Sequence, residues 1–292
     1  MTVSDLSLFG GLGSALDAVS NEIAQTQTEL ATGKRVNQPS DDPAAFAQGA
    51  TLATQQAALS NDVALATAAQ NTLATADNAL ANAANALDSA IQQATEGSSG
   101  TLSAAQMATL GQTVGGLLAQ VISAANLQYG GTYVFGGNQV LTTPYSSTGN
   151  YNGDSGSNAA VLSDGSTLQL TFNGAAIFGN QTSGAIGALV ALQSALNSGD
   201  QAGTAATLPQ LQAAVAQIAQ ARAQIGATSS TAAAVVTTDN SDLTTLASAQ
   251  NDAVGADLTQ LAATEQLQLT QQQALVSLGQ ALGKLPLINI LA

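Results

Sequence analysis

Apolar residues near the start of the chain recur at intervals of four, three, four and seven positions, the spacing of a coiled-coil seam. These positions are Leu12, Leu16, Val19, Ile23 and Leu30. Gly33 interrupts the pattern, and residues 36–42 contain the turn-forming residues of a loop. We therefore predict a first amphipathic helix that ends near Gly33.

A longer heptad pattern begins at Pro43. Asp42 precedes it, where an N-cap side chain accepts backbone N–H groups, and Pro43 suits the first helical position because it has no N–H to leave unpaired. The seam positions recur every seven residues, as Leu52, Leu59, Ala66, Leu73, Leu80 and Leu87, with Ala69, Ala76, Ala83 and Ala90 at alternate positions. These small residues predict a long helix that packs closely on another and ends within Gly97–Gly100.

A third helical stripe follows the Ser/Gly turn. Its apolar residues are Met107, Leu110, Val114, Leu117 and Val121. Because only a short turn separates it from the second helix, an antiparallel helical hairpin is the simplest prediction.

The pattern changes after residue 129. Seven of the nine aromatic residues gather between Tyr129 and Phe178, among many Gly, Asn and Asp. Short runs of β-favouring residues lie between turn signals, at Thr132–Phe135, Ala159–Leu162 and Thr167–Phe172. We predict that residues 131–183 form a small β insert with its own aromatic core.

Helical periodicity then returns and ends in a second heptad seam. One stripe comprises Leu208, Leu211, Val215, Ile218 and Ile225, and Leu243 and Leu246 lead into the final seam. That seam contains Val254, Leu258 and Leu261, then Leu275, Leu278, Leu282 and Leu285, with Gln268 in between. The seams at the two chain ends are natural partners, although Pro286 lies where the last helix would be expected to run on.

These patterns predict a mainly α protein of elongated, nested helical coiled-coil domains formed by both chain ends, with a small inserted β domain. The outer coiled-coil axial domain comprises residues 1–42 with 253–292. A long-helix bundle domain comprises residues 43–130 with 184–252, and the β insert of residues 131–183 is innermost.

The charge balance limits the possible partners. Charged residues are 8% of the chain, with 18 acidic against 4 basic residues and a net charge of −14. The basic residues are Lys34, Arg35, Arg222 and Lys284. Four scattered cations cannot form the basic patch that nucleic acid or an anionic membrane surface requires, so we expect neither as a partner. We expect a low-charge surface that contacts other protein.

Candidate chemistry is sparse. The chain has no Cys and no His, which removes thiol nucleophiles, thiolate ligands and the commonest general base. Asp41 and Asp42 are adjacent carboxylates, but capping of the Pro43 helix is favoured over metal binding. We therefore predict no catalytic residue, cofactor or metal. The N-terminal segment lacks the pattern of a cleavable secretory signal, so any export would use another route.

Three motifs resemble those of one known family. Residues Glu29–Ala45, ELATGKRVNQPSDDPAA, are similar to the loop that links the terminal helix of the flagellin superfamily to its first long helix. Ala124–Tyr145, with GTYVFGG, and Arg222–Ala227, RAQIGA, are similar to two further stretches of that family. Their order and spacing most resemble its hook-filament junction subunits.

The resemblance implies an extracellular subunit of the bacterial flagellum, located at the hook-filament junction, that acts as an adaptor between hook and filament. It implies export by the flagellar type III apparatus. The implied partners are other copies in a ring, a second hook-filament junction protein, flagellin, and a cytosolic export chaperone at the C-terminal segment.

Two groups of residues are candidates for assembly. We predict an assembly interface of Leu12, Leu16, Val19, Ile23, Leu30, Val254, Leu258, Leu261, Leu275, Leu278 and Leu282. We predict an inter-domain loop of Gly33, Lys34, Arg35, Pro39, Ser40, Asp41, Asp42 and Pro43. Alternative interpretations are a minimal filament flagellin, a secreted coiled-coil adhesin or type III effector, and an enzyme with a Ser or Thr nucleophile.

Overall fold

The computed structural model describes residues 3–283, with side chains described for residues 10–281. Its helices are α1 (Val3–Thr32), α2 (Pro43–Gly97), α3 (Ala104–Ala125), α4 (Gly174–Phe178), α5 (Gly184–Ser198), α6 (Gln201–Val254) and α7 (Leu258–Gly283). Its strands are β1 (Gln128–Tyr129), β2 (Thr132–Tyr133), β3 (Ala159–Val161) and β4 (Thr167–Gln169), which pair as the antiparallel hairpins β1–β2 and β3–β4. The predicted mainly α fold with a small β part is confirmed.

The chain divides into two units. The terminal unit comprises Met1–Ala57 with Asp242–Ala292, and the central unit comprises Ala58–Ser241. The division falls inside the two longest helices, α2 and α6, so each unit contains part of both. The finer three-part domain boundaries given above stay a prediction.

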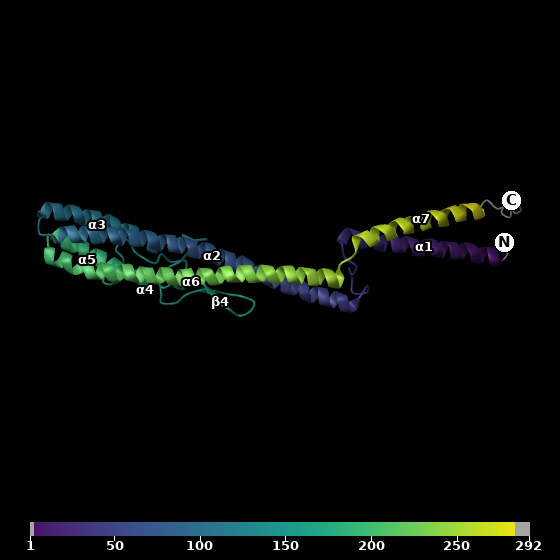
Figure 1. Cartoon of the computed structure of the whole chain (residues 1–292), viewed down its shortest axis with the longest axis horizontal. Coiled ribbons are helices and arrows are strands. Elements are labelled where there is room, and N and C mark those ends of the chain that lie inside the picture. Colours follow the sequence, from purple (N-terminus) through teal and green to yellow (C-terminus); the bar gives the residue numbers. More distant parts are fainter. Residues whose placement is uncertain (1–2, 284–292) are drawn as a thin grey trace. The chain divides into compact units, whose positions relative to one another are not determined.

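In the terminal unit, α1 and α7 lie side by side and run antiparallel (Figure 1). Two side-chain hydrogen bonds define their register: the Gln27 amide donates to the Glu265 carboxylate at 3.2 Å, and the Gln272 amide donates to the Ser20 hydroxyl at 3.3 Å. Seven residues forward along α1 therefore correspond to seven backward along α7. The predicted pairing of the two chain ends is confirmed.

The helix ends follow local backbone chemistry. Gly33 ends α1 with a φ of +68°, a conformation that glycine adopts at no steric cost, while its N–H donates to the Glu29 carbonyl. Asp42 caps α2 as predicted, since its carboxylate accepts the Ala45 N–H at 3.0 Å. This backbone bond is the main reason why the pKa of Asp42 is lowered.

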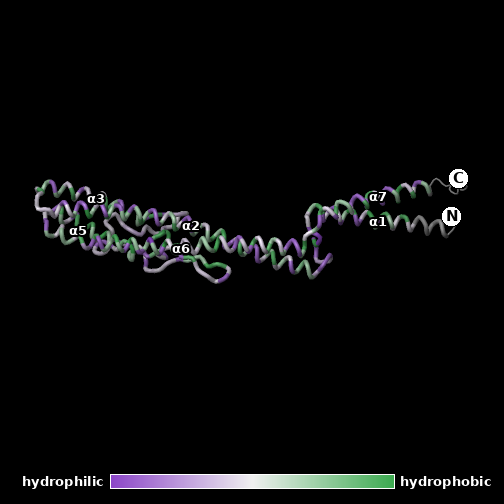
Figure 2. Tube along the Cα trace, viewed as in Figure 1, coloured by the Kyte–Doolittle hydropathy of each residue, from purple (hydrophilic) through white to green (hydrophobic). Residues whose placement is uncertain are grey.

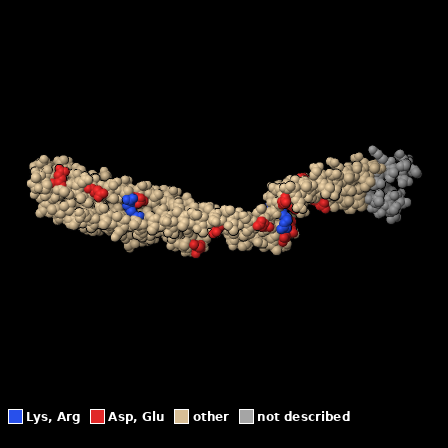
Figure 3. Space-filling view, viewed as in Figure 1, with Lys and Arg blue, Asp and Glu red and all other residues tan. Residues whose placement is uncertain are grey.

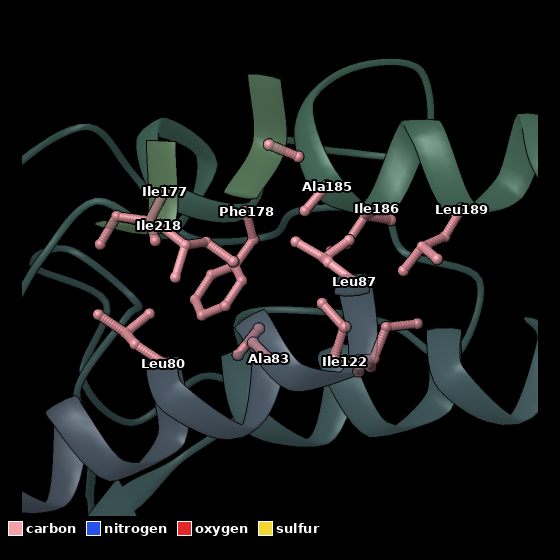
Figure 4. Packing of buried hydrophobic residues seen from close by; sticks show 14 of the residues in the cluster. Leu80, Ala83, Leu87, Ile122, Ile177, Phe178, Ala185, Ile186, Leu189 and Ile218 are labelled. Carbon is pink, nitrogen blue, oxygen red and sulfur yellow. The ribbon is translucent and has the colours of Figure 1, made fainter. Parts of the chain in front are cut away.

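In the central unit, α2, α3, α5 and α6 run alongside one another (Figure 1). The predicted seam of α2 is fully enclosed from its third heptad position onward, because Ala66, Leu73, Leu80 and Leu87 have no exposed surface. In Figure 4, Leu80 and Leu87 of α2 lie on one side of the core, and Ile186 and Leu189 of α5 lie on the opposite side. Alternating alanine and leucine thus allows close helix packing, as the heptads predict.

The insert differs from its prediction. Its strands are only two or three residues long, too short to bury large rings among themselves. Phe135 and Phe178 instead join the same cluster as Leu80 of α2 and Ile218 of α6. The prediction of a separate aromatic core is therefore wrong, because the long helices supply the surface that the hairpins lack.

A second, smaller cluster fixes the β3–β4 hairpin. Leu162 and Leu168 pack with Ala66 and Ala69 of α2 and with Ala232 of α6. Asp62 of α2 reinforces this contact, because its buried carboxylate accepts hydrogen bonds from the Ser163 backbone N–H and hydroxyl.

Candidate assembly interface

The N-terminal seam faces α7 only in part. Ile23 is buried, and Leu12, Leu16 and Val19 are half-buried. Leu30, at the end of α1, keeps 36% of its surface exposed. The stripe is therefore covered best at its centre and incompletely towards its ends.

The C-terminal seam is unexpectedly polar where it faces α1. Gln268 is buried at 8% exposure, and Glu265 and Gln272 make the two hydrogen bonds that join the helices. Leu261 and Leu275 of the predicted seam are half-buried, and Leu282 lies outside the residues whose side chains are described.

Several apolar side chains of α7 remain exposed. Leu258 and Leu278 of the predicted seam are about half exposed, at 50% and 51%. Leu267 and Val276, which sequence reasoning missed, are 58% and 43% exposed. Figure 2 shows polar and apolar residues interleaved along α1 and α7. Leu267 and Val276 are next to Gln268 and Leu275 in the sequence and therefore flank the seam, but the sequence alone does not show what covers each flank.

Charge is almost absent from α7. Glu265 is the one charged residue in its 26 residues. Figure 3 shows few charged residues on the face that it draws. A helix with exposed leucines and little charge is suited to contact with further protein rather than to lasting exposure to water.

The buried amide of Gln268 weakens the α1–α7 pair. Its Oε1 has no hydrogen-bond partner among the residues that the structure describes. A buried polar atom without a partner costs about 1–3 kcal/mol. The pair therefore gains little from its central layer.

The loop predicted to lie between domains, residues 33–43, lies within the terminal unit and binds the junction between α6 and α7. The N–H of Arg35 donates to the Val254 carbonyl at 2.8 Å, and Lys34 forms an antiparallel bridge with Gly255. The Arg35 guanidinium also donates to the Ala253 carbonyl at 3.3 Å and lies 3.5 Å from the Asp42 carboxylate. Val254, a predicted interface residue, is buried here within its own chain at 6% exposure.

Asp41 orders the tip of the same loop. Its Oδ2 accepts the backbone N–H groups of Asn37 and Gln38 at 2.9 and 3.0 Å. Pro39 and Ser40 form the exposed tip, and Pro43 starts α2. Both aspartates therefore have structural partners, and within the described residues no group of three acidic side chains is placed to hold a metal ion.

A polar pocket of about 290 Å³ lies between the loop and α1. Its polar lining residues are Gln25, Thr28, Glu29, Asn37, Gln38 and Asp41. Sequence reasoning missed this pocket, because it forms only when the loop folds back along α1.

Among the described helices, none is long and apolar enough to cross a membrane.

The sequence is similar to known flagellar proteins. Residues 12–140 match the family model of the bacterial flagellin N-terminal helical region. Flagellar hook-associated protein 3 of Salmonella typhimurium is 30% identical over 160 residues, which cover 54% of this chain and 50% of that protein. The matched segment thus spans about half the length of this curated relative.

Solved structures share the fold. FlgL from Bacillus cereus is similar with a TM-score of 0.59 and 23% identity, over 69% of this chain and 97% of the other. The flagellar junction protein FlgL from Legionella pneumophila has a TM-score of 0.57 and 17% identity, over 71% and 99%. The resemblance to the flagellin superfamily, and within it to hook-associated protein 3, is confirmed.

Proposed function

We propose that this chain is a structural subunit of the bacterial flagellum that joins the hook to the filament. The observation that carries the proposal is the terminal unit, in which α7 turns a polar stripe towards α1 and leaves Leu267 and Leu278 outward. Such a helix needs further protein neighbours. The similarity to hook-associated protein 3 supports the hook-filament junction as the place where it finds them. The proposal assigns no catalysis.

In this proposal, the residues of the predicted assembly interface fall into two groups with different contacts. Ile23 and Val254 stabilise the subunit's own helices, because they are buried within the chain. Leu258 and Leu278 contact neighbouring subunits, because each leaves about half its surface uncovered. Neighbours would include other copies in a ring, a second hook-filament junction protein and flagellin.

The proposal includes folding of the chain ends on assembly. Ordering a residue costs about 1–2 kcal/mol of backbone entropy, and α1 and α7 contain 30 and 26 residues. Burial returns about 25 cal/mol per Å² of apolar surface. Because the pair buries few large side chains and includes Gln268, its own contacts offset little of that cost. The helix pair therefore forms against neighbours and stays disordered in the monomer.

Disordered ends also suit export. A chain without cysteine and with weakly paired ends can pass unfolded through a narrow secretion channel, and we propose the flagellar type III apparatus for this step. A cytosolic chaperone would cover the C-terminal segment until then, because α7 exposes leucines when it has no neighbours.

The test is immunogold electron microscopy of intact cells with an antibody against residues 131–183. Cells that lack the gene provide the control. Label confined to the point where hook meets filament is the expected result. Label along the whole filament would instead make the chain a minimal filament flagellin, which would also fit the match to the flagellin N-terminal region. Label away from flagella would contradict both.

A further inference from the structure

Among the side chains that the structure describes in the terminal unit, one cation lacks an acidic partner. The chain has 18 acidic and only 4 basic residues, so carboxylates are in excess as ion-pair partners for the basic side chains. Arg35 lies beside Asp42, and Arg222 beside Asp77. Among residues 10–281, Lys34 has no carboxylate at ion-pair distance, and its side chain is exposed.

The pocket between α1 and the loop has the opposite character. It contains Glu29 and Asp41, and no Lys or Arg lines it. Glu29 accepts one hydrogen bond from the Gln25 amide at 2.9 Å, and the two backbone bonds of Asp41 both go to Oδ2. Both carboxylates retain lone pairs for a further donor.

Lys34 of the same chain does not line this pocket. Its backbone is paired with Gly255, and its carbonyl accepts the Asn37 side-chain amide at 2.8 Å. These bonds fix the backbone of Lys34 on the side of the loop that contacts the α6–α7 junction. No Lys or Arg of the described part of the chain lines the pocket, so it is open to a cation from another molecule.

We propose that the Lys34 ammonium of one copy enters the pocket of a neighbouring copy, between Glu29 and Asp41. An ammonium brings three donors, and the pocket offers carboxylate and amide oxygens around a space of about 290 Å³. The inference rests on the proposed assembly of identical copies and names one contact between them. Its effect is mainly on orientation, because partly exposed charge pairs select a partner geometry more than they add affinity.

We take this contact to be head-to-tail, because a reciprocal two-fold exchange of Lys34 between two copies would end at a dimer and could not build the proposed ring. In the head-to-tail arrangement, each copy inserts its Lys34 into one neighbour and receives the Lys34 of another. Repetition of such a contact closes a ring or continues as a helix and does not stop at a two-fold dimer.

Zero-length cross-linking tests the contact directly. Flagella sheared from cells are treated with a carbodiimide, which joins an amine to a carboxylate that it touches without adding a spacer. The chain contains only two lysines, Lys34 and Lys284, so the linked peptides can be assigned by mass spectrometry. We expect a ladder of products on a denaturing gel, with Lys34 linked to Glu29 or Asp41.

Matched variants sharpen the test. Lys34→Arg keeps the charge but removes the reactive amine, so it should assemble normally and lose the ladder. Glu29→Gln and Asp41→Asn should each weaken the ladder, whereas Asp17→Asn, on an exposed part of α1 away from the pocket, should leave it unchanged. Lys34→Glu should lower incorporation into flagella, and adding Glu29→Lys should raise it again.

The experiment distinguishes failure of the Lys34 contact from failure of the proposed function. Incorporation into flagella without any Lys34 cross-link between copies would overturn this inference alone, as would a Lys34 link to a different flagellar protein. A product that stops at the dimer would overturn the head-to-tail geometry. Absence of the chain from flagella would overturn the proposed function together with this contact.

Discussion

The guanidinium of Arg222 in α6 makes two parallel hydrogen bonds to the carboxylate of Asp77 in α2. The Nε–Oδ1 distance is 2.7 Å and the Nη2–Oδ2 distance is 3.0 Å. The pair joins the two long helices of the central unit across its partly exposed surface. Planar Arg fits a carboxylate in this two-point geometry, which the single ammonium of Lys cannot reproduce.

Replacing Arg222 by Lys should therefore lower the stability of the central unit slightly. Because the side chains are 41% and 38% exposed, water screens their attraction. We expect a loss of about 0.5–1 kcal/mol, seen as a lower urea midpoint. A double-mutant cycle with Asp77→Asn isolates the pair, and a coupling free energy of zero would contradict its role.

The same pair makes stability depend on pH. The hydrogen bond from Arg222 holds the pKa of Asp77 below its usual value of 3.8. A carboxyl whose folded-state pKa is lowered contributes fully above its unfolded pKa and loses its contribution as pH falls through the folded value. The stability advantage of the wild type over Asp77→Asn should thus be constant above pH 3.8 and shrink below it.

Urea midpoints for both proteins, measured on both sides of that pH, check this prediction. The comparison removes the effects of Asp42, Asp154 and Asp164, whose pKa values are also lowered, because both proteins contain them. A difference between the proteins that grows on acidification would show that the sign is wrong.

The shared core of insert and helices predicts that both unfold together. Phe178 has no exposed surface, and its ring lies 5.1 Å from Phe135 and 6.2 Å from Tyr145, among helix residues such as Ile218. Phe178→Ala should cost about 3–5 kcal/mol. Far-ultraviolet circular dichroism follows the helices, and tyrosine fluorescence follows the insert, since the chain has no tryptophan.

Both signals should move to the same lower denaturant midpoint. Leu141→Ala is the control, because Leu141 is 81% exposed and its loss should change neither signal. An insert that unfolds alone while the helices keep their original midpoint would contradict the common core.

The heptad spacing of apolar residues predicted the long helices well, because the residues at seam positions are the ones that become buried. The alternation of Leu80 and Ala83 in α2 repeats over many turns, and both side chains are almost wholly enclosed. The caps at Gly33 and Asp42 were also predictable, because each depends on its own residue and its immediate neighbours.

Features that depend on a distant partner could not be predicted in the same way. The five-residue helix α4 is too short to show a period. Asp62 is buried where it binds Ser163 of the β3–β4 hairpin, a partner 101 residues away in the sequence. The heptad of the last helix placed Leu278 in one seam with Leu275. In the structure, Leu275 is half-buried, whereas Leu278 is 51% exposed. Contact with α1 decides which of the two side chains is covered, and the sequence does not show that contact.

The buried amide of Gln268 provides the sharpest test of folding on assembly. If the weak central layer keeps the chain ends disordered in the monomer, Gln268→Leu should strengthen the pair. The change removes a buried Oε1 that has no partner in the described part of the chain. It adds apolar surface at the level where the register of the two helices places Ile23, a gain of about 1–3 kcal/mol.

Hydrogen exchange on the purified monomer measures the effect. Amides around Val19 and Ile23 should exchange freely in the wild type and measurably more slowly in Gln268→Leu. Gln266→Leu, at an exposed position of the same helix, should leave them unprotected. Strong protection already present in the wild-type monomer would contradict disorder of the ends. Equal protection in both variants would mean that added hydrophobicity, rather than the buried amide, controls the pairing.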